Sequence, residues 1–162
     1  MDYALRAFLP ADAAALSELT ALAIRETARR AYSPEQVTTW AQRAPAADWF
    51  VAQAAANAII RVAAAEDGTP AAYVLLEADG HLNMLYCHPQ HGGRGLGAAL
   101  LAEAEAEART RGLSRLFTEA SELARPVFAR AGYALLHRRD FTIGPDDAPV
   151  AIHNYAMERR IG

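Results

Sequence analysis

The chain has 162 residues, a length that suits one domain, residues 1–162, with a continuous hydrophobic core. Its formal net charge of -3 and its lack of any long basic run argue against nucleic acid or an anionic membrane as a partner. The single cysteine excludes an internal disulfide, and the sequence shows neither a signal peptide nor a membrane-spanning apolar run. We therefore expect a cytoplasmic protein.

The N-terminal part predicts a short strand followed by helices. Residues 3–8 alternate as a strand does. Residues 11–30 carry apolar side chains with helical spacing, at Leu16, Leu19, Leu22 and Ile24. The run Ser33-Pro34-Glu35-Gln36 is a capping box with proline at the first helical position, so a second helix should begin there. A third helix is expected over residues 48–57.

The middle of the chain predicts three antiparallel strands, over residues 60–65, 71–76 and 82–87. The first two are joined at Asp67-Gly68 and the last two at Asp79-Gly80. Because Asp-Gly pairs between apolar runs are strong hairpin signals, the three strands should form a meander.

The rest of the chain alternates helices and strands. Residues 94–111 predict a long helix that stops at Gly112, with Glu105/Arg109 and Glu107/Arg111 placed for pairing on its solvent face. After it we expect a strand over 113–118, a helix over 123–131 and strands over 133–139 and 150–158. A strand, helix and strand in succession imply a parallel pair, so the sheet should be mixed.

The most informative segment is the glycine-rich turn Gly92-Gly93-Arg94-Gly95-Leu96-Gly97, between the strand over 82–87 and the helix that follows. Glycines let the backbone approach a ligand and adopt positive φ. The first turn of the helix adds unpaired N–H groups and the positive end of its dipole. The segment is therefore typical of a site for a phosphorylated cofactor.

Two nucleotide-binding motifs compete for this turn. A P-loop requires a lysine, and none lies in or near the turn. A dinucleotide fingerprint begins at Gly95-x-Gly97, and Glu119 is suitably placed for a ribose. However, Leu100 occupies the third glycine position, and the chain after Glu119 is too short for a second mononucleotide half. Dinucleotide binding is thus the second choice.

The turn, preceded by Leu85-Tyr86-Cys87-His88-Pro89, resembles the acetyl-CoA signature of the GNAT superfamily of N-acetyltransferases, written Gln/Arg-x-x-Gly-x-Gly/Ala. Gly92 departs from its first position. Residues 120–133, which end in Gly132-Tyr133, resemble the family's later helix, and residues 154–159 resemble the terminal strand of a bacterial subgroup. The similarity extends from Ile60 to the end of the chain.

This resemblance implies an α/β fold with a central mixed, mostly antiparallel sheet flanked by helices and containing a splayed parallel strand pair. It implies an acetyl-CoA-dependent N-acetyltransferase, in which a primary amine of a small molecule or peptide attacks the thioester directly in a ternary complex. Homodimers are common among such relatives. The alternative is a regulatory module that binds acyl-CoA without catalysis, which Phe128 and the lack of an acidic base suggest.

The resemblance also implies which residues hold acetyl-CoA. The pantetheine arm would pair with the strand at Leu85, Tyr86 and Cys87. The pyrophosphate would lie on the backbone of Gly92, Gly93, Arg94, Gly95, Leu96, Gly97 and Ala98. Arg94 would add a charged contact or remain a solvated arginine. Ser121, Ala124 and Phe128 would face the cofactor, although helix capping also accounts for Ser121.

For catalysis, the resemblance assigns the Leu85 N–H to polarise the acetyl carbonyl. Strand alternation places His81, Asn83, Leu85 and Cys87 on one face, where His81 is the best general base. An exposed hairpin residue is the competing interpretation of His81. Phe128 replaces the family's tyrosine acid. A proton for the leaving thiolate would come from water, Tyr133, Tyr155 or Cys87, or would not be required.

Three further side-chain groups are assigned as follows. Cys87 is interpreted as a small buried hydrophobe rather than a nucleophile. No metal is expected, because the spacing of His81, Cys87, His88 and His91 matches no common ligand pattern. The candidates for lining the acceptor pocket are Tyr32, Trp40, Trp49 and Tyr73, with a core position favoured for Trp49.

Overall fold

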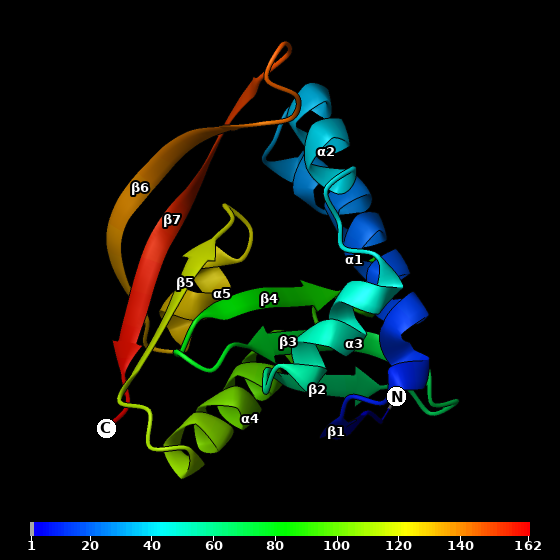
Figure 1. Cartoon of the computed structure of the whole chain (residues 1–162), viewed down its shortest axis with the longest axis vertical. Coiled ribbons are helices and arrows are strands. Elements are labelled where there is room, and N and C mark those ends of the chain that lie inside the picture. Colours follow the sequence, from blue (N-terminus) through cyan, green and yellow to red (C-terminus); the bar gives the residue numbers. More distant parts are fainter. Residues whose placement is uncertain (1) are drawn as a thin grey trace.

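The computed structural model describes residues 2–162 and contains two antiparallel sheets (Figure 1). The first has the order β1-β2-β3-β4, with β1 Ala4–Ala7, β2 Ile59–Ala64, β3 Pro70–Leu76 and β4 Leu82–Cys87. The second has the order β5-β7-β6, with β5 Arg115–Ala120, β6 Ala134–Ile143 and β7 Val150–Arg160. The helices are α1 Ala13–Glu26, α2 Pro34–Ala41, α3 Ala47–Ala55, α4 Leu96–Thr110 and α5 Arg125–Arg130. Short 3-10 turns are η1 Pro10–Asp12, η2 Ala28–Arg30 and η3 Pro89–His91.

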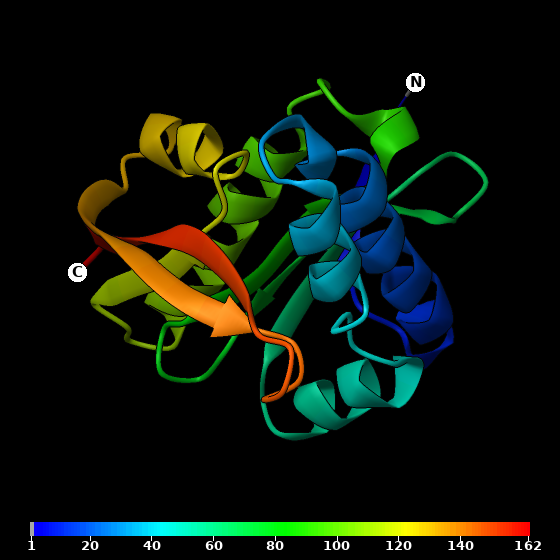
Figure 2. The same ribbon diagram turned by 90° about the horizontal axis from the view of Figure 1, so that it is seen from above.

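Helices cover both faces of the first sheet. On one face, α1 and α3 pack against β2 and β3 through a core of Leu16, Leu19, Phe50, Val62 and Tyr73. On the other face, α4 packs through Leu100, Leu101 and Ala104. The helix α2 lies beside the end of β6 and the start of β7, where Val37 and Ala41 belong to the same hydrophobic cluster as Ile143 and Ile152 (Figures 1 and 2). The observed fold thus confirms the helix-flanked mixed architecture.

The two sheets meet where β4 and β5 run parallel. One parallel bridge joins His81 to Phe117, and the Phe117 N–H donates to the Gly80 carbonyl at 3.1 Å. Gly80 is required there, because a Cβ at this position would collide with the Arg115 carbonyl oxygen. Beyond this point β4 and β5 diverge (Figure 1). The splayed parallel pair implied by the family resemblance is therefore present.

A bulge in β4 interrupts the regular alternation of its side chains, which the sequence had predicted. The register shifts so that Leu75 pairs with Met84 while Leu76 pairs with Leu82. Leu82 consequently joins the α4-side cluster together with Leu85, which a regular strand would place on the opposite face. The expectation that His81, Asn83, Leu85 and Cys87 share one face was therefore wrong.

Local signals located most helix starts correctly. The capping box at α2 is confirmed: the Gln36 N–H donates to Ser33 Oγ at 3.1 Å, and the Ser33 N–H donates to Gln36 Oε1 at 2.8 Å. The first helix is shorter than the predicted span of residues 11–30, since α1 ends at Glu26 and η2 follows.

The predicted solvent-face pairs on α4 were also wrong. Glu105 is buried and accepts hydrogen bonds from Arg159 at 2.8 Å instead of pairing with Arg109. Arg111 donates to the Asn57 carbonyl at 2.6 Å rather than to Glu107. Both partners come from distant parts of the chain, where the spacing along one helix carries no information.

Candidate active site

Two cavities meet at the divergence of β4 and β5. The first, called here the sheet cavity, has a volume of about 320 Å³ and lies among α1, α2 and strands β4 to β7. The second, the loop cavity, has a volume of about 570 Å³ and lies among the glycine turn, α4 and α5. Both are lined by Ile24, Trp40, Leu85, Tyr86, Ser121 and Ala124. Ligands in the two cavities can therefore touch beside β4.

The glycine turn forms one wall of the loop cavity. Every predicted residue of the turn lines it, namely Gly92, Gly93, Arg94, Gly95, Leu96, Gly97 and Ala98. Gly93 and Gly95 have φ of +73° and +76°, the left-handed region that glycine adopts without strain. Gly95 is the N-cap of α4, and no side chain caps this end. The first N–H groups of α4 therefore remain available for an anion.

Backbone groups of β4 face the gap between the two sheets. The His88 N–H donates to the Ala71 carbonyl at 2.8 Å, so His88 directs its N–H group toward β3. In an antiparallel ladder alternate residues direct their N–H groups away from the partner strand. Leu85 and Cys87 therefore direct theirs into the gap, where an extended ligand arm can pair with them.

The opposite wall comes from the β5–α5 turn and from α5. The Ala124 N–H donates to Ser121 Oγ at 3.1 Å, so the capping interpretation of Ser121 applies while Ser121 also lines both cavities. Phe128 is 2% exposed, lines the sheet cavity and meets the Tyr133 ring edge-on at 5.1 Å. A Cβ on Gly97 would lie 3.2 Å from Val127 Cγ1, so this glycine keeps α4 and α5 in close contact.

Arg94, within the turn, and Cys87, at the end of β4, have different surroundings. Arg94 is exposed and has no ion-pair partner within residues 2–162. Burial raises the pKa of the Cys87 thiol, although the charge of Arg94 opposes the shift. A raised pKa leaves less of the nucleophilic thiolate, which agrees with the interpretation of Cys87 as a packing residue.

His81 is held between two carboxylates. Its Nδ1 lies 2.9 Å from Glu77 Oε1, its Nε2 lies 2.9 Å from Glu119 Oε1, and its ring stacks on Phe117 at 5.0 Å. The hydrogen bond to Glu119 raises the pKa of His81, and the same bond lowers the pKa of Glu119. His81 is therefore not an exposed hairpin residue. As both ring nitrogens already face acceptors, the imidazolium form is favoured, and this form has no lone pair for a substrate proton.

Tyr133 lies behind the cavity wall. Its side chain is buried, it lines neither of the two cavities, and its hydroxyl donates to Glu105 Oε1 at 3.5 Å. Burial raises the pKa of Tyr133 well above its ordinary value. The structure thus places this predicted proton donor away from the junction. Tyr155, the other tyrosine considered, donates to Glu122 Oε2 at 2.8 Å.

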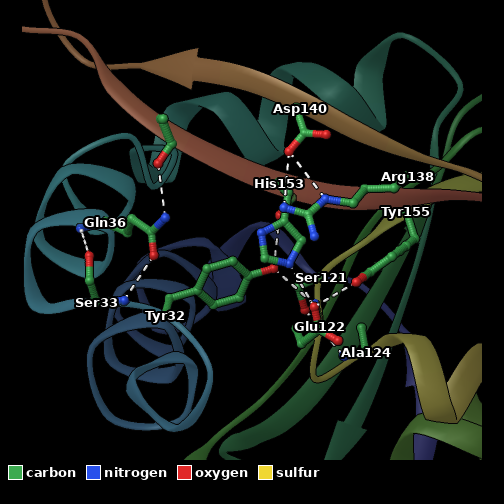
Figure 3. Close-up of polar contacts among 11 residues, drawn as sticks. Tyr32, Ser33, Gln36, Ser121, Glu122, Ala124, Arg138, Asp140, His153 and Tyr155 are labelled. Carbon is green, nitrogen blue, oxygen red and sulfur yellow. Dashed lines mark hydrogen bonds and ion pairs between the residues drawn. The ribbon is translucent and has the colours of Figure 1, made fainter.

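A polar network absent from the sequence predictions lies beside the sheet cavity (Figure 3). Tyr32 Oη donates to the His153 carbonyl at 2.9 Å and accepts from the Glu122 N–H at 2.9 Å. Glu122 Oε2 lies 2.6 Å from His153 Nε2 and also accepts from Tyr155. Tyr32 and Tyr155 were already sequence candidates, whereas Glu122 and His153 were not, and the only signal for this second pair was a histidine in the terminal strand.

The sequence model of the Acetyltransferase (GNAT) domain matches residues 28–142. The chain belongs to the GNAT family of acetyltransferases. It is an acetyl-CoA-dependent acetyltransferase, as the glycine turn indicated, and family membership favours the enzyme over the non-catalytic binding module.

Solved structures agree with the assignment to the GNAT family. A GCN5-related N-acetyltransferase from Rhodopseudomonas palustris shares 31% identity at a TM-score of 0.84, with 99% of this chain and 96% of that one covered. The PaiA N-acetyltransferase of Thermoplasma acidophilum, in complex with coenzyme A, shares 18% identity at a TM-score of 0.78, covering 99% of both chains. A Sinorhizobium meliloti phosphinothricin acetyltransferase in complex with acetyl-CoA shares 19% sequence identity at a TM-score of 0.76, with 100% of this chain and 90% of that one covered. At this level of identity, the last two structures show that this chain shares their fold. A comparison with curated protein sequences gives no significant match.

The four aromatic candidates in this GNAT protein separate into two pairs. Tyr32 and Trp40 line the sheet cavity, and Trp40 also lines the loop cavity. Tyr73 is fully buried, with its hydroxyl 2.5 Å from Thr20 Oγ1, and Trp49 packs edge-on against Phe50 at 5.1 Å. Trp49 is thus partly buried and packs against the core cluster, and Tyr73 is a core residue; neither of them lines the two cavities.

Within residues 2–162 no three His, Cys, Asp or Glu side chains are arranged to hold a metal ion. In the same residues no helix combines the length and the apolar character that crossing a membrane requires.

Proposed function

We propose that the protein transfers the acetyl group of acetyl-CoA to a primary amine by direct attack in a ternary complex. The observation that carries this proposal is the junction of the two cavities at Leu85, Tyr86, Ser121 and Ala124. Acetyl-CoA in the loop cavity and an amine in the sheet cavity would meet there, which replaces a bimolecular encounter by a positioned one.

On the donor side, the first N–H groups of α4 and the glycine turn would bind the pyrophosphate. The outward N–H groups of Leu85 and Cys87 favour pairing with the pantetheine arm along β4. The Leu85 N–H is the group proposed to polarise the acetyl carbonyl. Ser121, Ala124 and Phe128 would complete the wall around the thioester.

On the acceptor side, the charges of the sheet cavity favour an amine that also bears an anionic group. Glu119 offers a carboxylate to the ammonium, and His81 orients that carboxylate. Arg43 and Arg139 also line the cavity, and neither forms an ion pair within the described chain. Arg139 Nη1 donates to Asn154 Oδ1 at 2.9 Å, which holds its guanidinium in place. A carboxylate-bearing amine would use both signs of charge.

Departure of the thiolate needs no dedicated acid in this proposal. Phe128 has no proton to give, and the hydroxyl of Tyr133 is directed at Glu105. A thiol has a pKa near 8.5, so its thiolate is a tolerable leaving group near neutral pH. Water can protonate it afterwards.

The first experiment is titration of the protein with acetyl-CoA, with NADH as the competing ligand, followed by thiol release with a panel of amines. The panel contrasts amino acids with their amides, which lack the carboxylate. Acetyl-CoA binding with thiol release supports an acetyltransferase, and binding of NADH alone would contradict the donor assignment. A preference for the amides would contradict the assignment of the acceptor class.

The substitution Arg139→Ala tests the anionic subsite. It should raise KM for the carboxylate-bearing amine about tenfold and leave KM for the amide unchanged. The matched control is Arg138→Ala on the same strand, because Arg138 is exposed and pairs with Asp140 at 3.0 Å. Equal effects of Arg139→Ala on both substrates would remove Arg139 from acceptor recognition.

A further inference from the structure

The loop cavity continues past the glycine turn, between α4 and the segment formed by α5 and the residue after it. Val127 of α5 lies against Gly97 in the first turn of α4, where an added Cβ would come within 3.2 Å of Val127 Cγ1. Further along, Arg159 donates to the Ala131 carbonyl at 2.9 Å and to Glu105 of α4 at 2.8 Å. From these contacts onward, α5 therefore lies alongside α4 (Figure 2).

One face of α5 forms a wall of the loop cavity. Ala124, Val127, Arg130 and Ala131 all line the cavity, and residues three or four apart share one face of a helix. The wall begins with Ala124 at the junction with the sheet cavity and continues with Val127. It reaches Arg130 three residues later, about 4.5 Å further along the helix axis. The wall is thus apolar near the junction and cationic at its other end.

The charges that line the loop cavity are mostly positive. Among the described residues they are three arginines, Arg94, Arg130 and Arg159, and one glutamate, Glu105. Glu105 is buried and pairs with Arg159 at 2.8 Å, so these two charges offset each other. Arg94 and Arg130 are exposed, and neither forms an ion pair within residues 2–162. A chain of net charge -3 therefore keeps two uncompensated positive charges in this cavity.

The two unpaired arginines lie on different walls. Arg94 directly precedes Gly95, the N-cap of α4, where the pyrophosphate is proposed to bind. Arg130 lies on α5, past the level at which Val127 meets Gly97. Coenzyme A carries a second anionic group, the 3′-phosphate of its ribose, on the far side of the pyrophosphate from the thioester. Such a phosphate monoester carries about 1.5 to 2 negative charges at neutral pH, and a guanidinium can bind it through two parallel N–H groups.

We infer that Arg130 binds the 3′-phosphate of coenzyme A, and that this contact selects acetyl-CoA over acetyl donors that lack the phosphate. The inference rests on the proposed placement of acetyl-CoA in the loop cavity. In that placement the pantetheine arm follows β4 and the pyrophosphate occupies the glycine turn, so the 3′-phosphate is the anion that remains for Arg130. Glu105 is engaged by Arg159 and leaves the charge of Arg130 unopposed.

The test compares coenzyme A with 3′-dephospho-coenzyme A, which differs only by the missing phosphate. Calorimetric titration gives Kd for both ligands. Wild type should bind coenzyme A at least about tenfold more tightly, as one charge-assisted contact allows. Arg130→Ala should raise Kd for coenzyme A about tenfold and leave Kd for the dephosphorylated ligand unchanged, so that the preference disappears. Arg130→Lys keeps the charge without the paired donors and should retain part of the preference.

Two other arginines supply matched controls. Arg125→Ala removes the same charge from the same helix, but Arg125 lies over the Tyr155 ring at 4.4 Å and lines neither cavity. Its Kd values for both ligands should equal those of wild type. Arg94→Ala should change both Kd values by the same factor, because both ligands carry the pyrophosphate. Raising the ionic strength to about 0.5 M should weaken the wild-type preference, since salt screens an exposed charge.

The outcomes separate this inference from the proposed function. Equal Kd values of wild type for the two ligands, or an equal loss of affinity for both in Arg130→Ala, overturn the role of Arg130. Loss of the preference in Arg94→Ala but not in Arg130→Ala also overturns it. Wild type that binds neither ligand contradicts the placement of acetyl-CoA as well. A protein that shows the preference but releases no thiol with any amine contradicts acetyl transfer and supports the role of Arg130.

Discussion

Replacement of Gly95 by alanine separates ligand binding from folding at the glycine turn. Gly95 has φ of +76°, and a Cβ built on it meets no atom within 4 Å. Alanine at this position should therefore destabilise the fold only through its left-handed backbone conformation, by roughly 1–2 kcal/mol. Gly68, in the hairpin between β2 and β3, has φ of +87° and the same open surroundings, so Gly68→Ala is the matched control. Each substitution should lower Tm by about 2–8 °C.

The two variants should differ in acetyl-CoA binding. The methyl group at Gly95 points into the open space at the N-terminus of α4, where the pyrophosphate is proposed to bind. We expect Kd for acetyl-CoA, measured by calorimetric titration, to rise at least about tenfold, or about 1.4 kcal/mol. Gly68→Ala should leave Kd unchanged. Valine at Gly95 or Gly97 should abolish binding, and Gly97→Val adds a clash with Val127.

A wild-type Kd in Gly95→Ala would refute the phosphate site at this turn. The same Kd increase in both glycine variants would show that weakened folding, and not loss of a contact, reduces binding. Melting temperatures measured in the same buffer decide between these cases.

Two further predictions concern stability. The hydrogen bond to Glu119 raises the pKa of His81 in the folded protein. The contribution of this pair to the free energy of unfolding is therefore complete below the unfolded-state pKa of His81, about 6.5, and is lost as the pH rises through the folded-state pKa. In urea unfolding, His81→Ala should thus destabilise more at pH 6 than at pH 9; equal losses would contradict this pairing. Glu105→Ala removes the buried carboxylate that Arg159 donates to and should cost about 2 kcal/mol, since Arg159 is partly exposed and can turn to water, while Glu107→Ala, at a half-buried position with no ion pair in the described chain, should be nearly neutral. Thermal melts of both glutamate variants test the difference, and similar Tm values would argue against the buried pair.

Features that depend on a few neighbouring residues could be predicted from the sequence. The capping box at Ser33, the hairpins at Gly68 and Gly80 and the glycine turn before α4 all appear at the predicted positions. Each is fixed by backbone geometry that a short run of residues dictates, through positive φ, a local hydrogen bond or a cap. The strand β4 has the predicted bounds for the same reason.

The chemistry around these elements was decided by the tertiary structure. The second carboxylate at His81 comes from β5, the partner of Glu105 comes from β7, and Glu122 meets a histidine 31 residues away. The bulge in β4 changed which side chains share a face. Such contacts depend on how the two sheets meet. The sequence by itself thus determined the family, the fold class and the acetyl-CoA signature, while packing between distant segments determined which charged side chains pair with one another.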